Sequence, residues 1–473
     1  MSMSSPPPAH VLLVTAPLQG HVNPLLVLAR RLASRGLLVT FSTVPHAGLR
    51  SLTHDHEGGH GAPPVAGVGR GTLRFEHLRC GGLWSPDDPR YRVVDDVARH
   101  LDEAAPAALA ALIRRLADAG RPVSCVVANA FAPWALRTAG DMGLPRAMLW
   151  TQSCAVLSLY YHYFHSLAAF PPAGADEPNA AVAVPGLPAL AAAELPALIH
   201  APEEFIWRQA LVADIRSLRE TASWVLVNTF DELEHEAIEA LRVHLPVVTV
   251  GPLFESEKND DAGHDKCTAW LDAHAPRSVV YVAFGSLVKP SRDEMAVVAE
   301  GLAATGRPFL WVVRGDSRDL LPDDALVAAA SDRGKGKVVP WCNQRRVLSH
   351  RAIGCFVTHC GWNSTTETLA AGVPVVAYPA WSDQRTNAAF LADVYGVGVR
   401  LPTPPTREAL RRCVEEVTSG PLAEAMRARA GEWKAKASVA AADGGSSDRG
   451  VKDFVDAVRS IGVDKSITMA KTF

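Results

Sequence analysis

The sequence predicts an α/β protein with two domains, each built around a parallel sheet. Apolar runs of strand length alternate with helix-like stretches, and this alternation occurs in two separate arrays. Between the arrays lies FESEKNDDAGHDKC at 254–267, which is polar, acidic and poor in apolar residues. Strand–helix–strand units build parallel sheets, because a helix carries the chain from the end of one strand to the start of the next.

The first array begins with the apolar run HVLLVTAP at 10–17, which predicts a buried strand. NPLLVLARRLASRG at 23–36 ends in arginines and a glycine, as a helix C-terminus does, and LLVTFST at 37–43 predicts the next strand. VSCVVAN at 123–129 predicts a further strand, and the helix-like APWALRTAGDMG follows it.

The second array repeats this order. SVVYVAFGS at 278–286 predicts a strand, SRDEMAVVAEGLAATG at 291–306 a helix and PFLWVVR at 308–314 another strand. AIGCFVTH at 352–359 and VPVVAYP at 373–379 predict two more strands with a helix between them. We therefore expect a first domain over residues 1–245, a linker over 246–276, a second domain over 277–455 and a C-terminal helix or tail over 456–473.

Composition excludes several classes of protein. The 473 residues are 48% apolar and carry a net charge of −3, which suits a globular protein and makes nucleic acid an unexpected partner. The N-terminal apolar run is short and lacks the basic start of a signal peptide, so no leader and no transmembrane segment are expected. The eight cysteines form no C-x-x-C pair, which indicates reduced thiols and a cytoplasmic protein.

One stretch, THCGWNSTTETLAAGVPVVAYP at 358–379, places unusual polar residues between two apolar runs. A strand runs to His359, a turn contains Gly361, and Ser364 is expected to begin a helix. A helix that opens at the carboxyl end of a parallel strand favours an anion, because its free N–H groups and its dipole point there. His359, Asn363 and Ser364 add donors at that point, so the stretch suits a diphosphate held without a metal.

Structural interpretations compete with this one. Ser364 and Glu367 have the spacing of a capping box, which stabilises a helix and nothing more. Trp362 alone would favour core packing, and His359 alone a structural histidine. The convergence of His, Gly, Trp, Asn and Ser within six positions favours a ligand site.

The flanking residues carry a resemblance to a known family. WCNQ at 341–344 and PAWSDQ at 379–384 bracket the stretch, and residues 341–384 resemble the nucleotide-sugar signature box of plant UDP-dependent glycosyltransferases. AFGS at 283–286, GPL at 251–253 and DGGSSDRG at 443–450 are also similar to that family. Asn343 departs from it, because the family usually has Pro there, and we expect this to alter a turn and not the chemistry.

The resemblance implies the GT-B fold, in which two Rossmann-like domains face each other across a cleft. The first domain would bind the acceptor, the second would bind UDP-sugar, and the C-terminal helix would return to the first. It implies that Trp341 stacks on uracil, that Gln344 and Glu367 hold ribose, and that glucose is preferred over galactose. It also implies that Ser286, His359, Asn363 and Ser364 hold the diphosphate, and that Thr151, Asp383 and Gln384 hold the sugar. The expected UDP-sugar site further includes Gly20, Cys342, Gly361, Trp362 and Trp381.

His21 is the candidate catalytic base. It lies just past the first strand, where its side chain can face the cleft, and an unshifted pKa near 6.5 would suit a general base. Taken alone, it could equally be a helix-start histidine beside Asn23. In the family, this position takes the proton of the acceptor, which attacks the anomeric carbon with inversion.

Asn129, in ANAFAPW at 128–134, stands where most family members have the Asp that orients this histidine. An amide can hold the imidazole ring but cannot stabilise an imidazolium by charge. A carboxylic acid, with a pKa of about 4, is ionised at pH 7 and does not need a base, whereas a phenol with a pKa of about 10 does. The subgroup that this chain most resembles, which forms glucose esters of hydroxycinnamates and benzoates, also has Asn there.

The sequence therefore predicts an inverting glucosyltransferase that moves glucose from UDP-glucose to a small aromatic acid, as a monomer and without a metal or another cofactor. A phenol or flavonoid O-glucosyltransferase is the alternative, and a catalytically weak UDP-sugar-binding protein is a second one. A dehydrogenase is excluded, since the glycines at 67–71 neither follow a strand nor open a helix. YYHYFH at 160–165 predicts packing or acceptor-pocket lining in preference to a metal pair, because no third ligand is evident.

Overall fold

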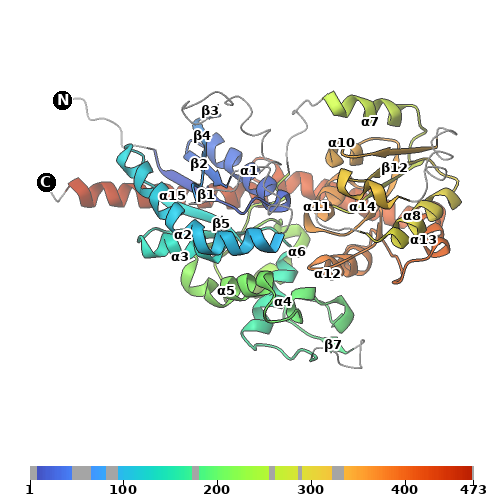
Figure 1. Cartoon of the computed structure of the whole chain (residues 1–473), viewed down its shortest axis with the longest axis horizontal. Helices are drawn as coiled ribbons and strands as arrows, with labels where there is room; N and C mark the ends of the chain where they lie inside the picture. The colour runs from blue at the N-terminus through green and yellow to red at the C-terminus, as the bar shows by residue number, and fades with distance from the viewer. Residues whose placement is uncertain are drawn as a thin grey trace.

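The computed structural model describes residues 8–44, 65–80, 94–172, 180–254, 262–285, 290–321 and 335–470. Within these ranges the chain forms two large sheets, each covered by helices on both faces, which lie side by side along the long axis (Figure 1). The predicted α/β class with two Rossmann-like domains is confirmed.

The N-terminal sheet has eight strands in the order β10-β9-β6-β5-β1-β2-β4-β3. All neighbours are parallel except β3 and β4, which form an antiparallel hairpin. The glycines at 67–71 lie in this hairpin, which confirms that they open no helix; the expectation that no strand precedes them is wrong, because β3 leads into the turn. The strands are β1 His10–Val14, β2 Leu38–Thr43, β3 Val65–Val68, β4 Gly71–His77, β5 Cys125–Asn129, β6 Arg146–Trp150, β9 Trp224–Val227 and β10 Val247–Thr249.

Helices cover both faces of this sheet because its central strands are apolar on both sides. Every residue of β1 and of β5 is buried, as expected where a parallel sheet lies between two helical layers. Helix α1 packs on one face, and α2, α3 and α5 pack together on the other. The helices are α1 Gln19–Ser34, α2 Val94–Asp118, α3 Pro133–Asp141, α4 Cys154–Phe164, α5 Ile206–Thr221 and α6 Asp231–Arg242; short elements are β7 Ala181–Val182, β8 Leu190–Ala191, η3 Ala192–Glu194 and η4 Ala197–Ile199.

The C-terminal sheet has six parallel strands in the order β13-β12-β11-β14-β15-β16. Helices α8 and α13 pack on one face, and α10, α11 and α14 on the other. The strands are β11 Val279–Ala283, β12 Phe309–Val312, β13 Gly336–Val339, β14 Ile353–Thr358, β15 Val375–Ala377 and β16 Gly398–Arg400. The helical elements are α7 Ala262–Asp272, α8 Arg292–Ala304, η5 Gly315–Leu320, α10 Gln344–Leu348, α11 Trp362–Ala371, α12 Gln384–Ala389, the π-helical turn η6 Phe390–Val394, α13 Arg407–Ser419, α14 Ala423–Ala441 and α15 Ser446–Ala470.

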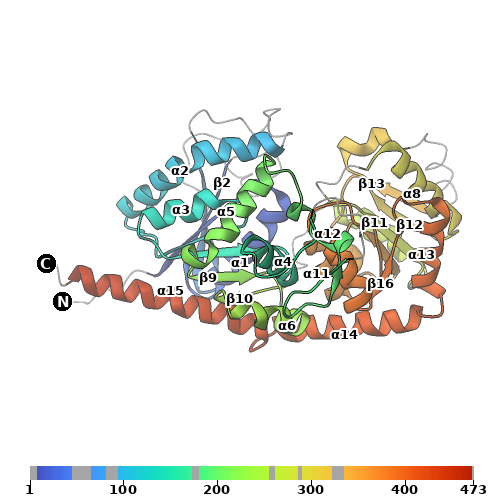
Figure 2. The same cartoon turned by 90° about the horizontal axis from the view of Figure 1, so that it is seen from below.

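Helix α15 belongs to the N-terminal half although it ends the chain. Helices α14 and α15 run one after the other along one side of the molecule, beneath both domains (Figure 2). Asp448 pairs with Arg35 of α1, and the ring of Phe454 meets Trp224 of β9 edge-on at 5.4 Å between centroids. These contacts begin at Asp448, before the tail expected from residue 456, because the first turn of α15 already lies on the N-terminal domain.

Hydrogen bonds fix the first residues of the segment that connects the two domains. Strand β10 joins the N-terminal sheet beyond residue 245, so we propose to end that domain after β10. Arg31 donates to the carbonyl oxygens of Val250 and Pro252 at 2.9 and 2.8 Å. The hydroxyl of Ser447 donates to the carbonyl of Gly251, so α1 and α15 both fix the point where the chain leaves the sheet.

No helix in the described part of the chain combines the length and the apolar character that crossing a bilayer requires.

Candidate functional site

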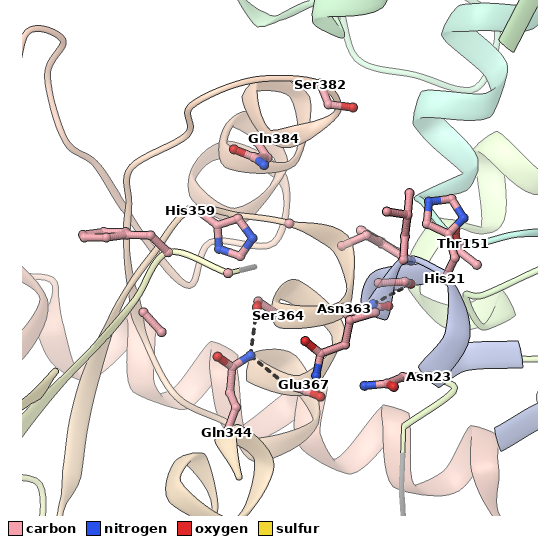
Figure 3. Close-up of a pocket in the computed structure, with 18 of the residues that line it drawn as sticks. His21, Asn23, Thr151, Gln344, His359, Asn363, Ser364, Glu367, Ser382 and Gln384 are labelled. Carbon is pink, nitrogen blue, oxygen red and sulfur yellow. Dashed lines mark hydrogen bonds between the residues drawn. The ribbon is translucent and has the colours of Figure 1, made fainter. Parts of the chain in front are cut away.

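A cavity of about 530 Å³ lies where the carboxyl ends of the two sheets face each other. Both halves line it. His21 and Thr151 come from the N-terminal half, and His359 and Gln384 approach from the C-terminal half (Figure 3). The expected site residues that line it are Gly20, His21, Thr151, Trp341, Cys342, Gln344, His359, Gly361, Trp362, Asn363, Ser364, Glu367, Trp381, Asp383 and Gln384. Asn129 is not among the lining residues, and Ser286 lies outside the described residues.

The turn between strand β14 and helix α11 is shorter than the sequence predicted. Strand β14 ends at Thr358, Cys360 adopts a left-handed conformation with φ 64°, and α11 begins at Trp362. Gly361 is the N-cap and has no side chain to cap the helix. The helix therefore does not begin at Ser364, as expected, and the competing interpretation of Ser364 and Glu367 as a capping box is wrong, because Ser364 lies inside the first turn. The uncapped N-terminus leaves the donors of that turn for a ligand.

Two glycines fix the ring of His359. A Cβ atom added at Gly285 or at Gly361 would lie 2.5 Å from the Nε2 atom of His359. No side chain can occupy either position while the ring stays where it is, because real Cβ contacts are longer. Gly285 also has φ 73°, a backbone conformation that favours glycine. The two glycines belong to AFGS and HCGWN, so both motifs shape the space around one imidazole.

Burial lowers the pKa of His359 to about 4, so the ring is neutral at pH 7. A neutral imidazole offers one N–H donor and no charge. An anion at this point would therefore be held by hydrogen bonds and by the N-terminus of α11 rather than by a cationic histidine.

Gln344 organises the floor of the cavity. Its Nε2 atom donates to Ser364 Oγ at 2.8 Å and to Glu367 Oε2 at 2.7 Å (Figure 3). The hydroxyl of Tyr281 donates to its Oε1 atom at 3.3 Å, which fixes the amide orientation. Glu367 is thereby oriented before any ligand arrives. Asn343 caps α10 by accepting from Arg346 N–H at 3.0 Å, a bond that a proline side chain could not make.

Two residues of α11 reach across to the N-terminal half. The indole N–H of Trp362 donates to the carbonyl of Asn228 at 2.7 Å, and Trp362 is 3% exposed. Asn363 Nδ2 donates to the carbonyl of Gly20 at 3.1 Å, next to His21 (Figure 3). Asn363 therefore lies between the two halves of the site, where a ligand that spans them would meet it.

Asp383 is buried at the same domain interface. Asn387 Nδ2 donates to its Oδ2 atom at 2.7 Å, and Gln152 Nε2 donates to its Oδ1 atom at 3.3 Å from the N-terminal half. Burial raises the pKa of Asp383 to about 6. Gln384 Oε1 accepts from the N–H groups of Ala380 and Trp381 at 2.9 and 3.1 Å, so it also shapes the loop before α12. The backbone N–H of Trp362 and the side chain of Ser382 also bond this carboxylate, so Asp383 is held in place from both sides of the interface.

His21 lies in the first turn of α1 and also lines the cavity, so both expectations for it are met. Its ring meets Phe131 edge-on at 5.8 Å between centroids. Burial lowers its pKa to about 4, well below the unshifted value that the sequence suggested. His21 is therefore a neutral and weak base at pH 7.

Asn129 does not hold this histidine. It is 1% exposed at the end of β5, and neither its amide oxygen nor its amide nitrogen has a hydrogen-bond partner among the described residues. The Nδ1 atom of His21 is likewise buried without a partner there. The expectation that Asn129 orients the ring by a hydrogen bond is wrong in this state. Within the described ranges, no carboxylate takes the place of that bond.

A residue that the sequence analysis missed fixes the neighbouring loop. Asp214 of α5 accepts from Phe131 N–H at 2.7 Å, and it also receives the N–H of Ala132, the N-cap of α3. Phe131 has φ 66°, so this bond holds a left-handed residue against His21. Burial raises the pKa of Asp214 to about 8. The available signal was an acid on the apolar face of a helix, beside Leu211, Ile215 and Leu218.

The histidines of 160–165 are structural. His162 Nδ1 bonds the carbonyl of Ser158 at 2.8 Å, and His165 Nε2 bonds that of Ile215 at 3.2 Å. The expectation of packing is confirmed for this segment. The described residues contain no group of three or more metal-ligating side chains.

Comparison with known proteins agrees with this geometry. Residues 215–427 match the family model described as UDP-glucoronosyl and UDP-glucosyl transferase. Gallate 1-beta-glucosyltransferase of Quercus robur is 42% identical over 97% of this chain and 91% of its own length. Cinnamate beta-D-glucosyltransferase of Fragaria ananassa is 39% identical over 97% of this chain and 84% of its own. A crystal structure of Os79 from O. sativa in complex with UDP is 30% identical, with a TM-score of 0.80 over 95% of this chain and all of the other.

Gly361→Ala tests the contact between Gly361 and His359. Gly361 has φ −60°, so alanine adds a clash without backbone strain. We expect affinity for UDP, measured by isothermal titration calorimetry, to fall about tenfold or more, since a displaced hydrogen bond of about 1.4 kcal/mol has that effect. Gly431→Ala in α14 is the control, because its Cβ meets nothing within 4 Å. Unchanged UDP affinity in Gly361→Ala would contradict the assignment of His359.

Proposed function

Because this chain belongs to the family of UDP-glucoronosyl and UDP-glucosyl transferases, we propose that it transfers glucose from UDP-glucose to the carboxyl group of a small aromatic acid. The product would be a 1-O-glucose ester, formed with inversion at the anomeric carbon. Relatives whose names specify gallate and cinnamate as acceptors support the class of acceptor.

The observation that carries the proposal is the weakness of His21 as a base. Its pKa of about 4 lies six units below that of a phenol, so taking a phenolic proton would cost about 8 kcal/mol before any bond to the sugar forms. An aromatic carboxylic acid is already ionised at pH 7 and needs no such transfer. Attack by a carboxylate is therefore the chemistry that this site favours.

The reaction then balances without a proton. A carboxylate oxygen of the acceptor attacks the anomeric carbon, the bond from that carbon to the diphosphate oxygen breaks, and UDP leaves with the electron pair. His359 and the first turn of α11 would stabilise the charge that grows on the diphosphate. His21 and Asn363 would hold the two substrates in line, since approximation supplies much of such a rate enhancement.

The donor is assigned to the C-terminal half. Trp341 is 48% exposed in the cavity, where its ring can stack on uracil, while Gln344 and Glu367 would hold the ribose. Thr151, Asp383 and Gln384 would hold the sugar, and we propose glucose as that sugar. We also propose a monomer in the cytoplasm: one chain supplies both halves of the site, and all eight cysteines are free thiols.

Phenol glucosylation is the second candidate, and the presence of His21 in the cavity favours it. It would require a partner that raises the basicity of this histidine.

The bond that forms in the product separates the two candidates. With an acceptor that bears both a carboxyl and a hydroxyl group, we expect glucose on the carboxyl group, because only that group is ionised at pH 7. Mass spectrometry of the product before and after mild alkaline hydrolysis should show loss of glucose. A main product that keeps its glucose in alkali is a phenolic glucoside and would overturn the proposal.

Asn129→Asp should shift acceptor preference toward phenols. A carboxylate near His21 would raise the pKa of the imidazole, and a rise of two units makes it a markedly better base. We expect the ratio of phenol to acid turnover, measured as UDP release, to rise about tenfold. Asn129→Ala is the control, since it alters the same buried position without adding charge. An equal ratio of phenol to acid turnover in both variants would contradict the proposal that the weak basicity of His21 disfavours phenols.

Binding of the sugar should weaken in acid. Asp383 accepts sugar hydroxyls as a carboxylate, and its pKa of about 6 means that it becomes protonated as the pH falls from 7 to 5. At pH 5 only about a tenth remains ionised, so the KM for UDP-glucose should rise several-fold. Asp383→Asn should have a high KM that does not change over this range. A constant KM in the unmodified enzyme would exclude this role for the carboxylate.

A further inference from the structure

We propose that Asp95 determines acceptor specificity by accepting a hydrogen bond from a ring hydroxyl at the end of the acceptor opposite its carboxyl group. The preferred acceptors are then aromatic acids with a hydroxyl group remote from the carboxyl. This inference rests on the proposed function, because it assumes that the carboxyl group of the acceptor faces the sugar.

A continuous wall of side chains leads from His21 to Asp95. The ring of His21 meets Phe131 at 5.8 Å, and Phe131 meets Trp207 edge-on at 6.1 Å. The indole N–H of Trp207 donates to Asp95 Oδ1 at 2.9 Å. All four residues line the cavity. Two successive ring contacts and one hydrogen bond thus connect the base to the acid along one wall of the cavity.

The N-terminal half lines the cavity with both apolar and uncharged polar side chains. Leu198 and Phe205 add apolar lining to that of Phe131 and Trp207. Among the described residues that line the cavity from the N-terminal half, Asp95 is the single charged side chain other than histidine. An aromatic ring would bury its faces against the apolar groups, and Asp95 is the charged acceptor that the Trp207 end of the wall offers to a far substituent.

The chemistry of a carboxylate selects what that substituent is. The bond from Trp207 occupies Oδ1, and within the described residues no hydrogen bond reaches Oδ2. Oδ2 can accept from a phenolic hydroxyl but repels the carboxylate of the acceptor. An acid that enters with its carboxylate toward Asp95 is therefore disfavoured. The orientation that remains places the hydroxyl at Asp95 and the carboxylate beside His21.

The neighbour of Asp95 shows that helix-end stabilisation does not explain this placement. Asp95 and Asp96 both lie in the first turn of α2, where acids stabilise a helix N-terminus. Asp96 pairs with Arg99 at 2.9 Å and does not line the cavity, whereas Asp95 does. Asp96 therefore provides a matched control with the same charge and nearly the same place in the helix.

The test compares 4-hydroxybenzoate with benzoate as acceptors. We expect Asp95→Ala to lower kcat/KM for 4-hydroxybenzoate about 10- to 100-fold, as loss of a hydrogen bond to a charged group does. The kcat/KM for benzoate should fall little or should rise, because the charge that repels its carboxylate is gone. For 4-hydroxybenzoate, the kcat/KM of Asp95→Asn should lie between the values of the unmodified enzyme and Asp95→Ala. Asp96→Asn should leave the ratio of kcat/KM values for the two acceptors unchanged. The ratio is the decisive readout, since a merely structural role for Asp95 would lower both values together.

Two failures can be told apart. Equal losses on both acids in Asp95→Ala and Asp95→Asn would overturn the role of Asp95 while the enzyme still makes glucose esters. Glucose on the hydroxyl of 4-hydroxybenzoate in the unmodified enzyme, detected as alkali-stable product, would overturn the proposed function itself. A ratio that changes only in the Asp95 variants, with an alkali-labile product throughout, supports both.

Discussion

The site depends on a hydrogen bond between its two halves, from the indole N–H of Trp362 to the carbonyl of Asn228. Trp362 is the first residue of α11, so the bond sets the distance between this helix and the edge of the N-terminal sheet. Asn363 reaches Gly20 beside His21 because of that distance. The carboxyl ends of two parallel sheets supply polar groups, and this contact makes them face one another as one site.

Burial determines the protonation states of the titratable groups in the site. The two imidazoles, His21 and His359, are neutral because surrounding protein replaces water, while Asp383 holds its proton more tightly than a solvated carboxylate does. The histidines of such a site therefore offer dipoles and hydrogen bonds in place of positive charge, which Arg314 and Arg345 supply elsewhere in the lining. It suits the stabilisation of a departing diphosphate by groups already in position, with little reorganisation as the charge moves.

The sequence predicted both sheets and most of the residues that line the cavity from the C-terminal half, because strand periodicity and the dense motif at 341–384 are local signals. It failed where backbone conformation or distant partners decide the structure. The helix start expected at Ser364 was wrong, because Cys360 adopts a left-handed conformation and the helix begins at Trp362. The link from Asn129 to His21 was wrong, and the bond from Asp214 to Phe131 was missed, since both depend on how two loops and a distant helix pack.

Helix α15 has a consequence for how this chain acquires its structure. Val451, Phe454, Val455 and Val458 fill the layer that α1 begins on the N-terminal sheet. The N-terminal domain therefore stays incomplete until a helix made long after it has emerged, with the whole C-terminal domain synthesised in between. During that interval an apolar face of its sheet remains uncovered, which makes the half-made chain a substrate for chaperones. The two domains are thus interdependent in folding, even though each has a sheet of its own.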